Sequence, residues 1–188
     1  MQFLGNLECG TMDVNLGNVR AKIACVKKAN IGSLKVHKID ITSCVWSVNE
    51  TQSSGTPGGT LTQQVWTQRT LNTIEPVSDT VGLSSNALTF APGTYLVNGQ
   101  FPAFSVGSHK ARMVCSDMQQ VYGTNAFTSN GVSVQTTSTI AAIVTFVQTT
   151  TCTFEHYVEN TNIQGAGTAC NIQDVPEIYS IVSIIKIG

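Results

Sequence analysis

The chain has 188 residues, of which 41% are hydrophobic and only 11% are charged, and its net charge is −1. Soluble domains usually carry about 25% charged residues, so Ser and Thr supply much of the polarity here. This composition excludes a helical bundle and intrinsic disorder. The balanced charge gives no basic face for nucleic acid. No apolar run approaches the roughly 18 residues of a membrane span, so we expect no membrane insertion.

The first 50 residues contain short runs in which apolar and polar residues alternate, as in half-buried strands, at 22–26, 34–41 and 44–48. A piece of this size buries little surface by itself, so it should need a partner surface in order to fold. We therefore predict that residues 1–50 are a β-rich attachment segment. Residues 1–14 lack the basic start and the apolar run of a secretory signal.

The segment 51–60 has the sequence TQSSGTPGGT and contains no bulky apolar side chain. Its content of Gly, Pro, Ser and Thr is typical of a linker or a long loop. We predict a linker over residues 51–61 and one head domain over residues 62–188.

The head contains many short strand-like runs separated by turn residues, without a helical period between them. This spacing predicts a β-sandwich or a β-barrel. The predicted strands are 63–71, 86–90, 94–101, 109–115, 119–123, 132–137, 139–148, 151–159 and 176–187.

Two of these runs, 140–147 and 178–187, carry apolar residues on both faces of the predicted strand. A sheet with one wet face does not need this pattern, and the sequence offers no helices to cover the second face. We therefore predict that subunits associate through this sheet. The expected interface residues are Ile143, Val144, Phe146, Val182 and Ile184.

Six cysteines, at 9, 25, 44, 115, 152 and 170, and three histidines are scattered along the chain. None shows the short spacing of a zinc site, and a chain of this length does not need disulfides in order to fold. We expect free thiols that act as small hydrophobic residues, and we expect no metal or cofactor.

His109, Lys110 and Arg112 form the only dense basic spot of the predicted head. In a strand, Lys110 and Arg112 point to the same face. They can pair with acidic residues of a neighbouring subunit or contact an anionic glycan, and we favour pairing between subunits.

Catalytic motifs are missing from the sequence, so we expect that the protein is not an enzyme. Glu155 and His156 are adjacent and would point to opposite faces of a strand, which argues against a catalytic pair. Trp46 and Trp66 flank the predicted linker, where we expect local packing in preference to a sugar platform.

Several blocks of the head, in order along the chain, resemble the C-terminal head domains of bacteriophage fibres and spikes. They are WTQRTLN at 66–72, LTFAPGTYLV at 88–97, FPA at 101–103, HKARM at 109–113, FEHY at 154–157, GAGT at 165–168 and EIYSIVSIIKIG at 177–188. Those heads are similar to the jelly roll of tumour necrosis factor and of the complement globular head, which assembles as a trimer. The resemblance implies an all-β, tumour necrosis factor-like jelly-roll sandwich that forms homotrimers, preceded here by a small β-rich N-terminal anchor.

A head of this kind usually ends a longer fibre, but no collagen-like or coiled-coil shaft precedes this one. The resemblance therefore favours a short knob on a virion surface, made in the host cytoplasm. Such a head fibre or decoration protein would be anchored to the capsid or another virion protein through residues 1–50. The alternative is a tail-associated adhesin that recognises a host-cell glycan or protein receptor through loops such as 160–173.

Overall fold

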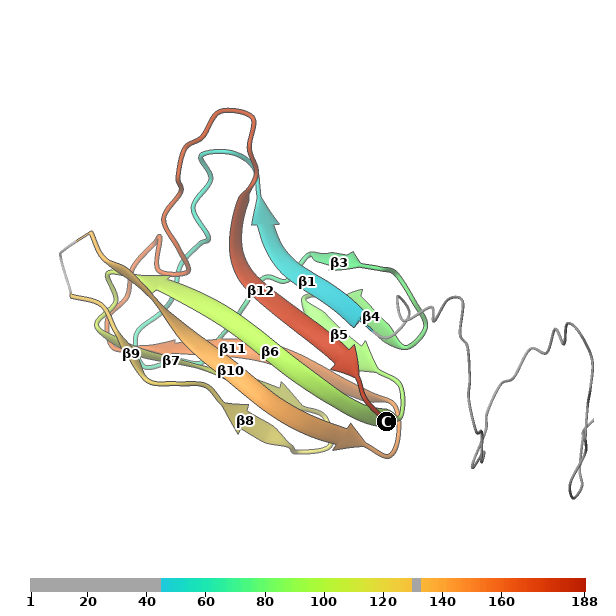
Figure 1. Ribbon diagram of the computed structural model, residues 1–188. Coiled ribbons are helices and arrows are strands. Elements are labelled where there is room, and N and C mark those ends of the chain that lie inside the picture. Colours follow the sequence, from blue (N-terminus) through green and yellow to red (C-terminus); the bar gives the residue numbers. More distant parts are fainter. Residues whose placement is uncertain (1–44, 130–132) are drawn as a thin grey trace, which may run out of the picture. The chain divides into compact units, whose positions relative to one another are not determined.

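The computed structural model describes residues 45–129 and 133–188, which form two antiparallel β-sheets and contain no helix (Figure 1). The five-stranded sheet has the order β10 (Gln135–Phe146), β6 (Gly93–Phe104), β12 (Glu177–Lys186), β1 (Val45–Gln52) and β3 (Thr73–Glu75). The seven-stranded sheet has the order β4 (Val81–Ser84), β5 (Ala87–Phe90), β11 (Thr150–Val158), β7 (Ser108–Cys115) and β8 (Gln120–Tyr122), with β2 (Thr67–Gln68) on β11 and β9 (Ala126–Phe127) on β7. The expected all-β sandwich is confirmed.

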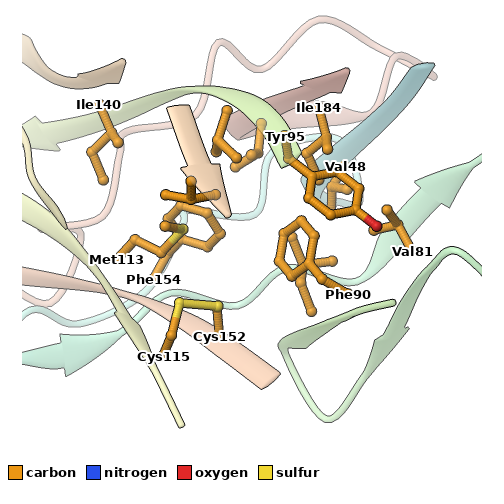
Figure 2. Packing of buried hydrophobic residues seen from close by; sticks show 14 of the residues in the cluster. Val48, Val81, Phe90, Tyr95, Met113, Cys115, Ile140, Cys152, Phe154 and Ile184 are labelled. Carbon is orange, nitrogen blue, oxygen red and sulfur yellow. A yellow bond between two sulfur atoms is a disulfide. The ribbon is translucent and has the colours of Figure 1, made fainter. Parts of the chain in front are cut away.

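The core lies between the two sheets and is filled by every second residue of the long strands. Figure 2 shows Ile140 of the five-stranded sheet on the same side of the core as Met113 and Phe154 of the seven-stranded sheet, while Ile184 lies beside Tyr95 and Val48, and all of them are buried. Phe154 also stacks on Phe101 of β6, with 5.2 Å between the ring centroids. Complete burial of one such side chain contributes about 1.5–3 kcal/mol, so this alternation is what holds the sheets together.

A disulfide joins β7 to β11 at the border of this core (Figure 2). Cys115 and Cys152 occupy directly opposed positions of the two strands, with 4.0 Å between their Cα atoms. The expectation of free thiols is wrong for this pair, because strand register brings together two inward-facing residues that are 37 positions apart in the sequence. Cys170 is free and exposed, and cysteines 9, 25 and 44 lie outside the described residues.

Strand β1 crosses the boundary that the sequence places between residues 50 and 51. It pairs with β12, from Val45 opposite Ile185 to Gln52 opposite Glu177, and it pairs with β3 on its other side. Residues 45–50 are therefore part of the sandwich. The rest of the predicted attachment segment, residues 1–44, lies outside the described residues.

The predicted linker at 51–61 is hydrogen-bonded to the sandwich. The backbone N–H of Gly55 donates to Glu177 Oε1 at 3.1 Å, and that of Gly58 donates to the carbonyl of Gly167 at 2.9 Å. In Figure 1 this loop and the loop that leads into β12 lie side by side beyond the ends of β1 and β12. Backbone hydrogen bonds hold this loop in place and require no apolar side chains. Its composition therefore resembles that of a linker although the loop is fixed to the sandwich.

The remaining strand predictions agree with the structure in most places. The predicted strands 132–137 and 139–148 form the single strand β10, and 94–101 extends to Phe104 in β6. The predicted strand 63–71 contains only the two residues of β2, because Gln64 takes a φ of 56° and interrupts the extended chain. The short strands β3, β4 and β9 escaped prediction, whereas the similarly short β5 and β8 were found. The runs 22–26 and 34–41 lie outside the described residues.

Candidate functional site

A groove of about 570 Å³ opens on the outer face of the seven-stranded sheet. We call it the β7 groove. Its sides include Gln64, Lys110, Asn125, Phe127, Tyr157 and Glu159, and the buried His109 lies at its base. Ligand pockets in proteins typically measure about 300–1,000 Å³, so the groove is large enough for a small molecule.

Strand pairing explains how these side chains come together. The odd-numbered residues of β7 from His109 onward are buried, which turns Lys110 outward. Tyr157 of β11 lies directly opposite Lys110. On the other side of β7, Phe127 of β9 pairs with Ser108 and is 63% exposed. Two aromatic side chains from neighbouring strands therefore flank the start of β7.

An aromatic cluster borders the groove at Tyr157. The ring of Trp66 lies 5.5 Å from that of Tyr157 and 6.1 Å from that of Tyr122. The guanidinium of Arg112 lies 4.0 Å from the Trp66 centroid and forms an ion pair with Glu155, 2.6 Å from Nη2 to Oε2. The charge of Arg112 is therefore paired within its own subunit, which weakens the expectation that it pairs with a neighbouring one.

Beneath the groove, two buried histidines share a hydrogen bond. His109 Nδ1 lies 2.9 Å from His156 Nε2, and His109 Nε2 lies 2.8 Å from the hydroxyl of Thr136. Because that hydroxyl donates to the carbonyl of Phe127, we assign the Nε2–H of His109 as donor to Thr136. His109 Nδ1 then accepts from His156, and His156 Nδ1 has no partner among the described residues.

This arrangement favours neutral imidazoles. Burial, together with the positive charge of Arg69, lowers the pKa of His109 from 6.5 to about 4. Burial also lowers the pKa of His156 well below 6.5, with smaller contributions from Arg69 and His109. A proton on His109 Nδ1 would require His156 to carry its own proton on Nδ1, which has no partner among the described residues. The pair is therefore fixed and uncharged at neutral pH, and it gives the groove a rigid base.

A buried ion pair lies elsewhere in the sandwich and ties β1 to the residues after β2. Arg69 Nη2 lies 2.7 Å from Glu50 Oε2, and both side chains are almost fully buried. Arg69 also donates to the carbonyls of Pro102 and Ala166, and the hydroxyl of Ser180 donates to Glu50. Burial lowers the pKa of Arg69, and the Glu50 carboxylate opposes that effect through its charge and its hydrogen bond.

The outward surface of the five-stranded sheet, on which no other strand of residues 45–129 and 133–188 packs, carries apolar residues, and we call it the uncovered sheet face. Ile143 of β10 is 66% exposed, and Ile181 of β12 is 38% exposed. A hollow of about 320 Å³ is lined by Ile181 of β12, Asn98 of β6 and Ala141 of β10, among others. Strands β6 and β10 contain no charged residue at all.

The predicted interface residues divide between the two sides of this sheet. Only Ile143 lies on the uncovered sheet face. The other four are buried in the core of the subunit, namely Val144, Phe146, Val182 and Ile184. Figure 2 shows Ile184 within that core. The sequence indicated that both faces are apolar but did not show which face points inward, so these four residues were assigned to the wrong side.

The predicted basic spot is also split by the structure. His109 is buried, Lys110 lines the groove, and Arg112 is paired with Glu155.

Glu155 and His156 point to opposite faces of β11, as expected. Trp46 is buried in the core, as the expectation of local packing required.

Within residues 45–129 and 133–188, no three His, Cys, Asp or Glu side chains are placed to hold a metal ion. In the same residues no helix is long and apolar enough to cross a membrane.

The globular domain of a zebrafish complement 1qA protein is similar in structure, with a TM-score of 0.50 and 14% sequence identity over 77% of this chain and 98% of that one. This chain has a complement 1q-like fold. Two crystal structures of murine APRIL, at pH 8.5 and 8.0, also match, with TM-scores of 0.49 and 0.45 and identities of 11% and 9%, each over 77% of this chain and 98% of the other. No family model and no curated protein matches the sequence.

The complement 1q-like fold confirms the expected jelly roll, of the kind found in tumour necrosis factor. At 14% identity the likeness concerns the fold alone. Functional arguments therefore depend on the chain's own side chains.

Proposed function

We propose that this protein is a homotrimeric knob on the surface of a bacteriophage particle, a head fibre or decoration protein without catalytic activity. The observation that carries the proposal is the uncovered sheet face, where Ile143 and Ile181 are exposed on a sheet whose strands β6 and β10 carry no charge. Contiguous exposed apolar surface marks an interaction site, and the centres of protein interfaces are depleted in charged residues.

The virion setting rests on the resemblance of residues 62–188 to phage fibre heads. We propose that the N-terminal residues before β1 attach the knob to the capsid or another virion protein, and that the chain is made in the host cytoplasm. A particle surface would hold many copies, and a trimer would bring three N-terminal segments to one attachment point.

Sedimentation equilibrium of the full chain tests the trimer directly, with an expected mass three times the 20.0 kDa of the monomer. Ile143→Asp should give monomers at micromolar concentration, because a carboxylate would be buried in the interface. Ile163→Asp is the matched control, since Ile163 is 75% exposed in the loop between β11 and β12 and belongs to none of the strands of this sheet. A wild-type chain that remains monomeric at micromolar concentration would overturn the proposal of a trimer.

The virion setting has its own test. Antibodies against the purified chain should label the surface of intact particles in electron micrographs. Particles that lack the chain would refute the knob even if the trimer forms.

A second candidate is an adhesin, and the β7 groove is the observation that favours it. An adhesin needs a ligand site that remains open in the assembly, and this groove lies on the sheet opposite the uncovered sheet face. Binding of the purified chain to host cells distinguishes an adhesin from a purely structural knob.

A further inference from the structure

We propose that the β7 groove binds the ring of a neutral saccharide, held between Tyr157 and Phe127. The inference goes beyond the trimeric knob, since a single subunit carries the whole groove. It also deepens the adhesin candidate, because it names a site and a class of ligand for that candidate.

The two aromatic side chains supply the apolar part of the site. Tyr157 and Phe127 belong to strands on either side of β7, and both line the groove. Phe127 is 63% exposed although a large apolar side chain gains by burial. A pyranose ring presents C–H groups on its faces and hydroxyls around its edge, so an aromatic side chain can cover a face without occupying a hydroxyl.

The polar part of the site consists of side-chain groups whose hydrogen-bonding capacity is not used within the described residues. The side chains of Gln64, Lys110 and Asn125 and the hydroxyl of Tyr157 have no hydrogen-bond partner in the part of the chain that the structure describes. Together they offer both donors and acceptors around the aromatic walls. A ligand with an apolar face and a rim of hydroxyls satisfies both kinds of group.

Charge favours a neutral ligand over an anionic one. Lys110 and Glu159 contribute one positive and one negative side chain to the groove. Arg112, the nearest other cation of β7, is already paired with Glu155. A single balanced ammonium is a poor match for a phosphate, which proteins usually hold with several donors or with arginine forks. Nucleotides are therefore disfavoured, although their bases could stack on the same rings.

The groove is also formed in advance. His109 at its base is held by Thr136 and His156, and Glu159 Oε2 accepts the backbone N–H of Ser108 at 2.9 Å. Both aromatic residues are in paired strands. A ligand would therefore not have to order the backbone on binding. A millimolar affinity is sufficient for a site that trimeric knobs display many times on one particle.

Saturation-transfer NMR on the full-length protein tests the proposal, with glucose, galactose, mannose and N-acetylglucosamine as probes and adenosine as a flat, neutral control. At least one sugar should bind with a dissociation constant of about 10 mM or tighter. Tyr157→Ala and Phe127→Ala should each weaken that binding by about tenfold or more. Tyr122→Ala should leave it unchanged, because Tyr122 contacts the same Trp66 and is 55% exposed but does not line the groove.

A second pair of variants keeps the test decisive if Tyr157→Ala fails to fold. Tyr157→Phe retains the ring and removes the hydroxyl, and Lys110→Met retains the length of the side chain and removes the charge. Each should weaken the sugar severalfold with the circular dichroism spectrum unchanged.

Three results would overturn the proposal. The first is that none of the four sugars binds, whether or not adenosine does. The second is a loss of binding in Tyr122→Ala as large as in Tyr157→Ala, which would place the sugar elsewhere on the aromatic cluster. The third is a change of sedimentation mass in Phe127→Ala without sugar binding, which would show that a second copy of the chain covers the groove. Since the sugar assay does not require a virion, its failure is distinguishable from failure of the proposed knob.

Discussion

The buried His109–His156 pair should make the folded subunit sensitive to mild acid. The pKa of His109 is lowered from 6.5 to about 4 in the fold, so between these values the unfolded chain binds a proton that the folded chain excludes. The stability that depends on a neutral His109 is fully present above pH 6.5 and is lost as the pH falls toward 4. At pH 5 the loss from His109 alone is about 2 kcal/mol, or about 30-fold in the ratio of folded to unfolded chains. His156, whose pKa is also lowered, adds a loss in the same direction.

Urea unfolding followed by tryptophan fluorescence at pH 7, 6 and 5 measures this loss, because Trp46 is buried. The protein concentration must be fixed, since association would make the apparent stability depend on it. The double variant His109→Gln, His156→Gln should be less stable at pH 7 but nearly insensitive to pH between 7 and 5. Glu177→Gln is the control, because backbone hydrogen bonds from Cys170, Asn171 and Gly55 lower the pKa of Glu177, which places its titration below this window. An unchanged slope in the double histidine variant would refute the role given to the pair.

Three further predictions concern covalent, ionic and strand contacts. Replacing Cys115 and Cys152 with alanine should lower the free energy of unfolding by about 4 kcal/mol for a 37-residue separation, and an equal urea midpoint with and without the disulfide would contradict this. Arg69→Met should cost about 3–5 kcal/mol because Glu50 remains buried and unpaired, whereas the double variant with Glu50→Met should recover part of the loss in a thermal melt. Deletion of residues 1–44 should preserve cooperative unfolding, while deletion through residue 52 should abolish it by removing β1, as circular dichroism would show.

The fold could be predicted because the alternation of apolar and polar residues that produces its strands repeats along the sequence. Alternating residues located the long strands β6, β7, β11 and β12, although β10 was predicted as two strands and β6 as shorter than it is. The short strands were found unevenly: β5 and β8 were predicted, but β3, β4 and β9 were not, since two to four residues seldom define a period. β1 was found only in part, because its end at Thr51 and Gln52 has the same polar composition as the loop that follows.

The site was harder to predict because it depends on register and orientation. Alternation shows that two faces of a strand differ, but Ile143 and Ile184 have the same chemistry on opposite sides of the sheet. Only the pairing of β7 with β9 and β11 places Phe127 and Tyr157 on either side of Lys110. The pairing of β7 with β11 also brings Cys115 and Cys152 together. The spacing of these residues in the sequence predicted neither the groove nor the disulfide.

The two outward surfaces of the sandwich differ in a way that separates assembly from ligand binding. The uncovered sheet face carries Ile, Leu, Ala, Ser and Thr together with the exposed amides of Asn98 and Gln100, on charge-free strands β6 and β10 and on β12, which suits a contact between copies of the chain. The outer face of the seven-stranded sheet combines aromatic rings with Lys110, Arg112 and Glu155, which suits a wet polar ligand. Substitutions can therefore separate the two roles. Ile143→Asp should abolish the trimer without affecting the affinity of one subunit for sugar, and Tyr157→Ala should do the reverse. Ile184→Asp should unfold the subunit and so remove both, because its side chain lies in the core.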